Sequence, residues 1–256
     1  VVRQVVRQLK PKSLAGTVIA VPIVNLFGLL NESRYLPDRR DLNRSFPGSR
    51  RGSLAAQLAY LFMNEVVARS DVGIDLHTGS GGRFNSPQLR CDVDDPRTLE
   101  LARVFGASLI VHSKLRDGSL RGAALLEGKR VLVYEAGEAG RFDRNAVRIG
   151  VRGVLGVLRH LEMVSAASAE DVPIPSICRS TVWERARVGG FCEMLVEPNE
   201  RVSKGQPIAS IFDALEKAAT VVKAQHAGRV IGMLMNGLVN RGDALVHIAQ
   251  DEEPLS

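Results

Sequence analysis

The sequence predicts an α/β fold, in which a mostly parallel, mixed sheet is flanked by helices and followed by a small all-β domain. Three observations predict it. Apolar runs rich in β-branched residues, over 17–25, 71–77 and 129–135, indicate buried strands. Segments with apolar residues at helical spacing alternate with these runs, as in layered α/β proteins. Beyond residue 178 this alternation gives way to short strands and turns.

The chain begins with VVRQVVRQL, whose apolar residues fall on one face of a helix. TVIAVPIVN, residues 17–25, is predicted to be a buried strand of the parallel sheet. Residues 26–52 lack a regular pattern, and a loop of this length in a compact domain is usually functional or disordered. Ser53 is suited to cap a helix that runs to about Arg69.

DVGIDLHTG, residues 71–79, predicts a short buried strand that stops at a turn of small residues. The elements expected after it are a glycine-rich loop over 79–90, a helix over 96–105, a short strand over 108–111, a connecting segment, a strand ending at Tyr134 and Glu135, and a helix capped by Asp143.

Composition divides the chain into an α/β domain over 1–164, a linker over 165–178 and a small β domain over 179–256. The linker contains small, polar and proline residues. In the last part ARVGGFCEMLVEPNERVSKGQPIASI is echoed by AQHAGRVIGMLMNGLVNRGDALVHIA. Such a repeat predicts a small β-sandwich or barrel with pseudo-twofold symmetry.

The net charge of +6 is spread along the chain, so we expect a surface that attracts small anions and no binding of nucleic acid. No apolar run is long enough to span a bilayer and no signal peptide is visible, so no membrane association is expected. Three scattered cysteines suggest neither a disulfide framework nor a metal site. A cytoplasmic location is therefore expected.

Polar residues stand at the ends of three predicted strands, at Asn25, His77 and Glu135. Ligands of open α/β sheets bind outside the carboxyl ends of the strands. At the end of its strand, His77 is either a structural residue whose ring is hydrogen-bonded within the protein, or a metal ligand. Glu135 is either a general base in a partly dry cleft or the partner of Arg141 or Arg144 in a structural ion pair.

The loop sequence DLNRSFPG contains Asn43 and Arg44. A guanidinium binds a carboxylate through two parallel hydrogen bonds, and the neighbouring amide can add a third. The alternative interpretation of this motif is a surface loop with one salt bridge. Together with His77 and Glu135, this pair fits a zinc hydrolase. Zinc lowers the pKa of bound water, a glutamate takes the proton and a cation fixes an anionic substrate.

TVIAVPIVNLFGLL, DLNRSFPG, GIDLHTG and VYEAGEA occur in this order along the chain. With these motifs the sequence resembles the succinylglutamate desuccinylase/aspartoacylase family of zinc-dependent deacylases over about residues 1–250. The resemblance implies a zinc carboxypeptidase-like α/β fold and a C-terminal domain similar to the biotinyl/lipoyl barrel sandwich. Lys223 lacks flanking methionines, so a carrier role is not expected.

The resemblance also implies the site. His77 matches the third ligand of a single zinc ion, and Asn43 with Arg44 matches the pair that binds the substrate carboxylate. Glu135 matches the general base that activates the zinc-bound water and later protonates the leaving amine. From the residues themselves, further candidate substrate contacts in the segment after His77 are Arg83, Asn85 and Arg90.

The first two zinc ligands of the family lie on a His-x-x-Glu motif, which this sequence does not contain. We expect them upstream of Val1, and we expect the chain alone to bind zinc weakly and to be nearly inactive. A fragment and a protein that has lost activity are both compatible with this, and the uncapped first helix favours the fragment. The predicted function is removal of an acyl group from a small anionic N-acyl amino acid.

Two other functions fit the same residues. The Asn43–Arg44 pair could serve a non-catalytic protein that binds small carboxylates, and a zinc carboxypeptidase acting on peptides would share the metal chemistry. A homo-oligomer is compatible with the composition.

Overall fold

The structure is a computed structural model that describes residues 1–165, 173–215 and 219–255. The helices are α1 (Val2–Gln8), α2 (Leu26–Leu30), α3 (Leu54–Phe62), α4 (Pro96–Phe105), α5 (Leu120–Leu126) and α6 (Arg144–His160). There are also short 3-10 helical turns at Pro11–Ser13 and Leu42–Arg44, and a π-helical turn at Met63–Val67. The strands before residue 165 are β1 (Val72–Gly79), β2 (Arg83–Cys91), β3 (Leu109–His112) and β4 (Arg130–Glu138).

After residue 173 the described chain forms strands only. They are β5 (Ser176–Cys178), β6 (Ser180–Arg185), β7 (Gly190–Met194), β8 (Arg201–Val202), β9 (Pro207–Phe212), β10 (Ala219–Lys223), β11 (Gly228–Leu234), β12 (Leu238–Val239), β13 (Ala244–Gln250) and β14 (Glu253–Pro254). None of the helices among the described residues has the length and apolar character needed to cross a membrane.

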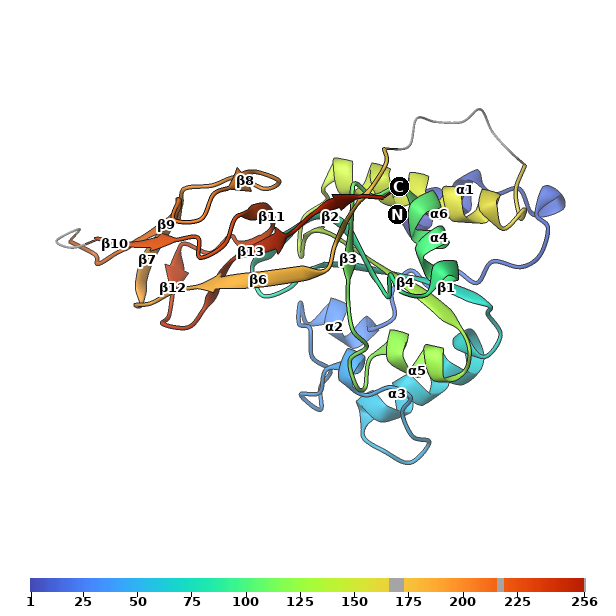
Figure 1. The fold of residues 1–256 in the computed structure, drawn as a ribbon. Helices are drawn as coiled ribbons and strands as arrows, with labels where there is room; N and C mark the ends of the chain where they lie inside the picture. Colours follow the sequence, from blue (N-terminus) through green and yellow to red (C-terminus); the bar gives the residue numbers. More distant parts are fainter. Residues whose placement is uncertain (166–172, 216–218, 256) are drawn as a thin grey trace.

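A ten-stranded mixed sheet runs through the molecule along the path β14-β5-β3-β2-β11-β13-β6, with β4 joining β1 to β2 and β8 paired to β11. A second sheet of four strands, β10-β9-β7-β12, lies at the far end of the C-terminal part (Figure 1). The β1–β4, β2–β3 and β3–β5 pairs are parallel, whereas β2–β4 and β2–β11 are antiparallel. The predicted fold of a mixed sheet flanked by helices is confirmed.

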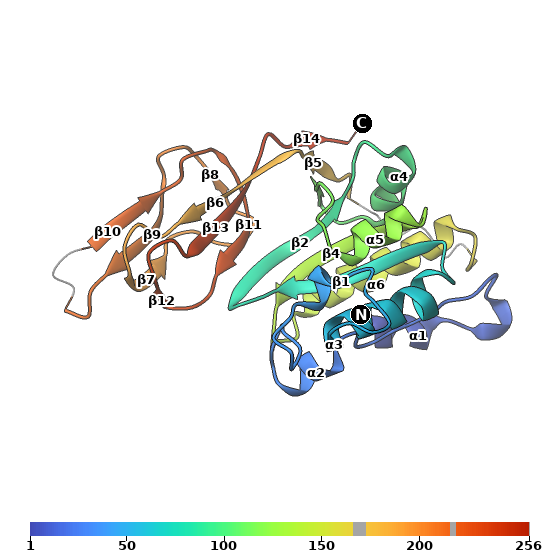
Figure 2. The same ribbon diagram turned by 90° about the horizontal axis from the view of Figure 1, so that it is seen from below.

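Helices cover both faces of the sheet in the first part of the chain (Figures 1 and 2). On one face α4 and α6 pack against β2 and β4 in a core that contains Phe105, Leu132 and Tyr134. On the other face α3 and α5 pack against Val131 of β4. Side chains alternate along a strand, so Val133 and Glu135 share the face of Val131 and point to the side of α3 and α5.

The predicted helix caps are present. Ser53 and Asp143 each accept a hydrogen bond from the backbone N–H three residues later, at the starts of α3 and α6. Asp95, which was not predicted as a cap, does the same at the start of α4. These bonds satisfy amides that a helix leaves unpaired in its first turn. The caps therefore set where the helices that support the sheet begin.

Residues 17–25 do not form the predicted strand. The segment is irregular, and Ile19 and Ile23 are 41% and 46% exposed. No described strand pairs with it, and Pro22 lacks an N–H for a ladder. Its apolar residues pack instead through Val18 and Val24 against the two helical cores. The segment has the composition of a strand, but a β-strand also requires a neighbouring strand with which its backbone can form hydrogen bonds.

Residues 79–90 are not the predicted glycine-rich loop, because most of them belong to β2. This strand pairs with β4, β3 and β11, and its register slips between Asn85 and Gln88. Pro87 lies in this irregularity, the position that a proline can occupy in a central strand. Similarly, the predicted connecting segment after β3 contains α5.

The C-terminal part has a core of its own, which includes Ile208, Ile211, Leu245 and Ile248. It is also joined to the first part through the β2–β11 pairing in the ten-stranded sheet. Of the predicted linker, residues 166–172 lie outside the described residues, and the last three form β5, which pairs with β3. The division into an α/β domain, a linker and a β domain stays a prediction.

Candidate functional site

A cavity of about 660 Å³ opens where β1 and β4 end. The side chains predicted for the site come from four separate stretches of the sequence, and all of them line it: Asn43, Arg44, His77, Arg83, Asn85, Arg90 and Glu135. The structure therefore brings these residues together, while their individual roles stay predictions.

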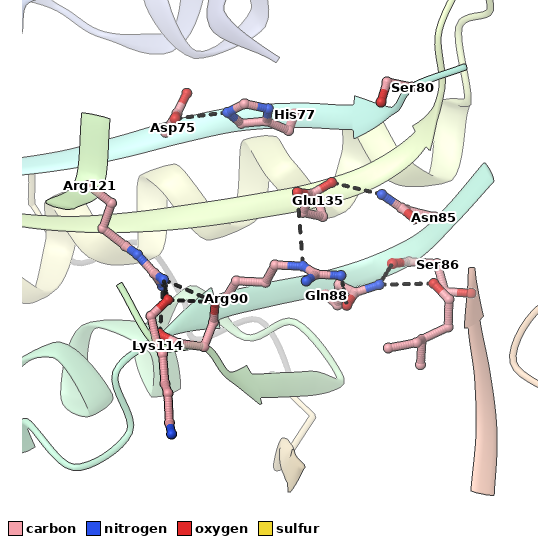
Figure 3. Close-up of polar contacts among 12 residues, drawn as sticks. Asp75, His77, Ser80, Asn85, Ser86, Gln88, Arg90, Lys114, Arg121 and Glu135 are labelled. Carbon is pink, nitrogen blue, oxygen red and sulfur yellow. Dashed lines mark hydrogen bonds and ion pairs between the residues drawn. The ribbon is translucent and has the colours of Figure 1, made fainter. Parts of the chain in front are cut away.

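His77 and Glu135 are direct neighbours. They occupy the same register position on the parallel strands β1 and β4. Asp75, two residues earlier on the same face of β1, lies 2.8 Å from His77 Nε2 through its Oδ2 (Figure 3). Burial alone would lower the pKa of His77, but the hydrogen bond and charge of Asp75, with the charge of Glu135, raise it to about 9. In this arrangement His77 is an imidazolium that donates to Asp75.

Glu135 is held mainly from β2. Asn85 Nδ2 donates to its Oε2 at 2.7 Å, and Arg90 Nε lies 3.9 Å from its Oε1 (Figure 3). Its side chain is 19% exposed toward the cavity. Because Oε1 accepts no hydrogen bond from the described residues, this partly buried carboxylate can accept a proton from a water in the cavity.

The turn that carries Asn43 and Arg44 is fixed at both ends. Asp41 accepts from Asn43 N at 2.9 Å, and Asn43 Oδ1 accepts from Leu120 N at 2.8 Å. Gly118 has φ +71°, and a Cβ there would lie 2.5 Å from Arg44 O. A glycine is therefore required where the two segments touch. The turn places Arg44 at the cavity, and Asn43 Nδ2 has no hydrogen-bond acceptor among the described residues.

Arg44 faces a positive environment. Partial burial and the charge of Arg116 lower its pKa, Asp41 opposes them, and Arg34 lowers it further. Arg34 is already paired with Asp41, at 2.9 Å. An anion beside Arg44 would relieve this repulsion.

Several cavity residues were not predicted from the sequence. The clearest are Asp75, Arg116, Arg121, Trp183 and Arg185. Asp75 could have been predicted from the sequence, because it lies two residues before His77 and therefore on the same face of the strand. Trp183 and Arg185 come from β6, more than a hundred residues beyond β1, and carry no local signal.

Arg121 reaches the cavity from α5. Its Nη2 donates to Ser113 O and to Lys114 O, each at 2.9 Å, while Nη1 is buried and has no partner among the described residues. No carboxylate of the described chain forms an ion pair with it. It is a cation whose charge is left uncompensated by these residues.

Trp183 also lines the cavity. Its ring stacks on His247 with centroids 4.4 Å apart and planes 5° from parallel, and the guanidinium of Arg83 lies 5.7 Å from its centroid. Burial and the charge of Arg90 lower the pKa of His247 to about 3, so the buried imidazole is neutral.

His247 should make the protein sensitive to acid. The unfolded chain takes up a proton at His247 near pH 6.5, whereas the folded protein does so only near pH 3, so its contribution to stability is lost as the pH falls between these values. We expect about 2 kcal/mol of the loss in unfolding free energy between pH 7 and pH 5 to come from this residue. The variant His247→Phe keeps an aromatic ring beside Trp183. In urea unfolding, its free energy of unfolding should fall between pH 7 and pH 5 by about 2 kcal/mol less than that of the wild type. An equal loss in the variant and the wild type would contradict this.

A separate group of potential metal ligands lies outside this cavity, at Asp92, Asp94 and His112. Asp94 is exposed and its Oδ1 is bound by Arg179 at 2.8 Å. Of the described residues, this is the group in which three His, Cys, Asp or Glu ligand atoms come within reach of one ion, and it does not include His77.

The sequence is similar to a known protein family and to a named enzyme. The sequence model of the succinylglutamate desuccinylase/aspartoacylase catalytic domain matches residues 1–161. The N-alpha-acetyl-L-2,4-diaminobutyric acid deacetylase of Halomonas elongata is 28% identical over 263 residues, which cover 97% of this chain and 76% of the relative.

The fold is also similar to those of solved structures. A succinylglutamate desuccinylase/aspartoacylase from Rhodobacter sphaeroides superposes with a TM-score of 0.87 at 27% identity, over 98% of this chain and 80% of that one. An ectoine utilization protein from Ruegeria pomeroyi has the same fold, with a TM-score of 0.87 at 22% identity and the same coverage.

The matched region contains β1, β2, β4 and the turn that carries Asn43 and Arg44. The Halomonas elongata relative is named as a deacetylase, and the Rhodobacter sphaeroides protein as a succinylglutamate desuccinylase/aspartoacylase. The chain belongs to the succinylglutamate desuccinylase/aspartoacylase family.

Proposed function

We propose that this protein hydrolyses the amide bond of a small, anionic N-acyl amino acid. The observation that carries the proposal is the pairing of His77 with Glu135 at the ends of two parallel strands, beside a cavity with a large excess of positive charge. Its relationship to a deacetylase supports the reaction type.

In the proposed reaction Glu135 takes a proton from the attacking water and later gives it to the nitrogen of the leaving amine. The oxygen of the water bonds to the acyl carbon, and the carbon–nitrogen bond breaks. Arg44 binds the substrate carboxylate through parallel hydrogen bonds, and the free Nδ2 of Asn43 adds a donor. The fixed turn of these two residues holds the scissile bond in place beside Glu135.

Zinc in hydrolases of this kind polarises the carbonyl and activates water from a site with three protein ligands. The described residues supply His77, bonded to Asp75, and no group of three ligands around it. They do not by themselves complete such a site, so no step is assigned to the metal. Zinc dependence, and low activity of these 256 residues alone, stay predictions that metal analysis with and without a chelator would check.

The charge of the cavity supports an anionic substrate. Eight Arg or Lys side chains line it against three carboxylates. The carboxylates already face cations of the protein, Asp41 with Arg34, Asp75 with His77 and Glu135 with Arg90. The cations without an ion pair among the described residues are Arg44, Arg83, Lys114, Arg116, Arg121 and Arg185.

This charge predicts a substrate preference that differs from the named relative's. N-acetyl-aspartate and N-acetyl-glutamate carry a second carboxylate, whereas N-α-acetyl-2,4-diaminobutyrate carries an ammonium group. We expect kcat/KM to be at least about 10-fold higher for the dicarboxylates, and to fall as salt rises from 50 to 500 mM. Product analysis by mass spectrometry checks both. A preference for the ammonium substrate would contradict the proposal.

Cavity size favours a small substrate over a peptide. Trp183 and Arg185 of β6 and Ala244 of β13 also line the cavity, so residues of the C-terminal part contribute to its walls. Peptide cleavage in the same assay would support a carboxypeptidase instead. Zinc-independent binding without any turnover would support the non-catalytic alternative.

A further inference from the structure

Asn85 makes the shortest hydrogen bond to Glu135. Its Nδ2 lies 2.7 Å from Glu135 Oε2, and the residue is 8% exposed (Figure 3). The amide is therefore largely shielded from water, and its one contact with the proposed catalytic machinery is this carboxylate. Asn85 also lines the cavity, so the substrate contact predicted from the sequence stays a prediction.

The backbone of β11 fixes the Asn85 amide from behind. Asn85 and Gly232 are register partners in the β2–β11 pair. A Cβ at residue 232 would lie 2.9 Å from Asn85 Oδ1. The irregular register of β2 after Asn85 turns the strand locally, as bulges do, and aims this side chain at Glu135 on β4. The amide thus has little freedom to leave the carboxylate.

The other oxygen of Glu135 is not held in the same way. Arg90 Nε is 3.9 Å from Oε1, too far for a hydrogen bond. Arg90 Nη2 is directed instead to Gln88 Oε1 at 3.4 Å, and Gln88, which is fully buried, donates to Ile231 O of β11 at 2.9 Å. Arg90 therefore stays beside Oε1 without occupying its lone pairs.

We propose that Asn85 is a positioning residue that holds Glu135 through Oε2, so that Oε1 is the atom that moves the proton. The proposal rests on the proposed deacylase function. The attacking water gives its proton to Oε1 as its oxygen bonds to the acyl carbon. Oε1 returns that proton to the amine nitrogen as the carbon–nitrogen bond breaks, and Asn85 keeps its own protons throughout.

The first test is a double-mutant cycle with Asn85→Leu, which keeps approximately the shape of the side chain without the donor. The protein is assayed at its native metal content. We expect kcat to fall about 10- to 100-fold, with KM changed less than about threefold. In a Glu135→Gln background the same substitution should cost less than about twofold, because the two residues act as one unit.

Ser86→Ala is the matched control. Ser86 is the next residue of β2, is also buried and does not contact Glu135. Its kcat should stay near that of the wild type. Wild-type kcat in Asn85→Leu would overturn the proposal, and so would a change confined to KM or an undiminished loss in the Glu135→Gln background.

A second measurement does not depend on turnover or on the folding of Asn85→Leu. Charge-assisted hydrogen bonds are shorter and stronger than neutral ones. The side-chain amide protons of Asn85 should therefore move upfield in the NMR spectrum of Glu135→Gln, while those of Asn64, which donates to Tyr60 O, should not. An unchanged Asn85 signal would overturn the proposal. A wild type without turnover would overturn the proposed function, and the NMR result would then decide this proposal alone.

Discussion

Glu135→Gln is expected to reduce kcat by about 10²- to 10⁴-fold, because the amide that replaces the carboxylate cannot carry a proton from water to the leaving amine. Binding should survive, since the substitution preserves shape and can still accept from Asn85. KM is therefore expected to stay within about threefold of the wild type. Steady-state rates of amine release measure both parameters.

Glu138→Gln is the matched control for this variant. Glu138 lies at the end of the same strand, and its Oε1 is bound by Arg141 at 2.6 Å. It does not line the cavity formed by the described residues. We expect near wild-type turnover. If Glu138→Gln were the inactive variant and Glu135→Gln the active one, the assignment of the base would be wrong.

Arg44→Lys is expected to lower kcat/KM about 10- to 100-fold. Lysine keeps the positive charge but cannot present two parallel N–H donors to a carboxylate. Arg44 Nη1 donates to Asn43 O within the turn. The bonds from Asn43 N to Asp41 and from Leu120 N to Asn43 also hold the turn and do not involve the guanidinium, so the fold should be retained. Calorimetric titration with the free amino acid product should show the same loss in affinity.

Arg50→Lys tests whether that loss is specific. Arg50 is an exposed residue six positions later and lies outside the cavity. Its variant should bind and turn over substrate as the wild type does. Equal losses in the two variants would mean that only the general positive charge of the surface is involved.

Local patterns were sufficient for the elements that carry the chemistry. β1 and β4 are apolar runs with clear ends, and α4 and α6 begin at capping aspartates, so their types and positions follow from a few neighbouring residues. Because parallel strands place their carboxyl ends together, these elements alone bring His77 close to Glu135.

Pairing between distant strands could not be predicted in the same way. β2 contains Pro87 and polar residues, and it is a strand because β4, β3 and β11 each pair with part of it. Residues 17–25 have strand composition but no partner in the described chain. Sequence composition describes the segment itself, whereas a sheet depends on what lies beside it.

The same limit applies to the cavity. Asn85 was predicted as a substrate contact, which stays a prediction because the residue lines the cavity, but its hydrogen bond to Glu135 could not be predicted from the sequence. Trp183 reaches the cavity only because β6 and β13 extend the common sheet. These placements depend on contacts between residues fifty or more positions apart.

The central claim is that the cavity hydrolyses an anionic N-acyl amino acid. Because low activity is predicted for these 256 residues alone, the most direct test uses the wild-type protein in its full natural length. The protein, with its metal content measured, is incubated with N-acetyl-aspartate, and free aspartate and acetate are quantified over time. We predict release of both in equal amounts, lost in Glu135→Gln and retained in Glu138→Gln. Saturable binding of the substrate to metal-loaded wild-type protein, with no release of either product from this or any other N-acyl amino acid, would contradict the claim.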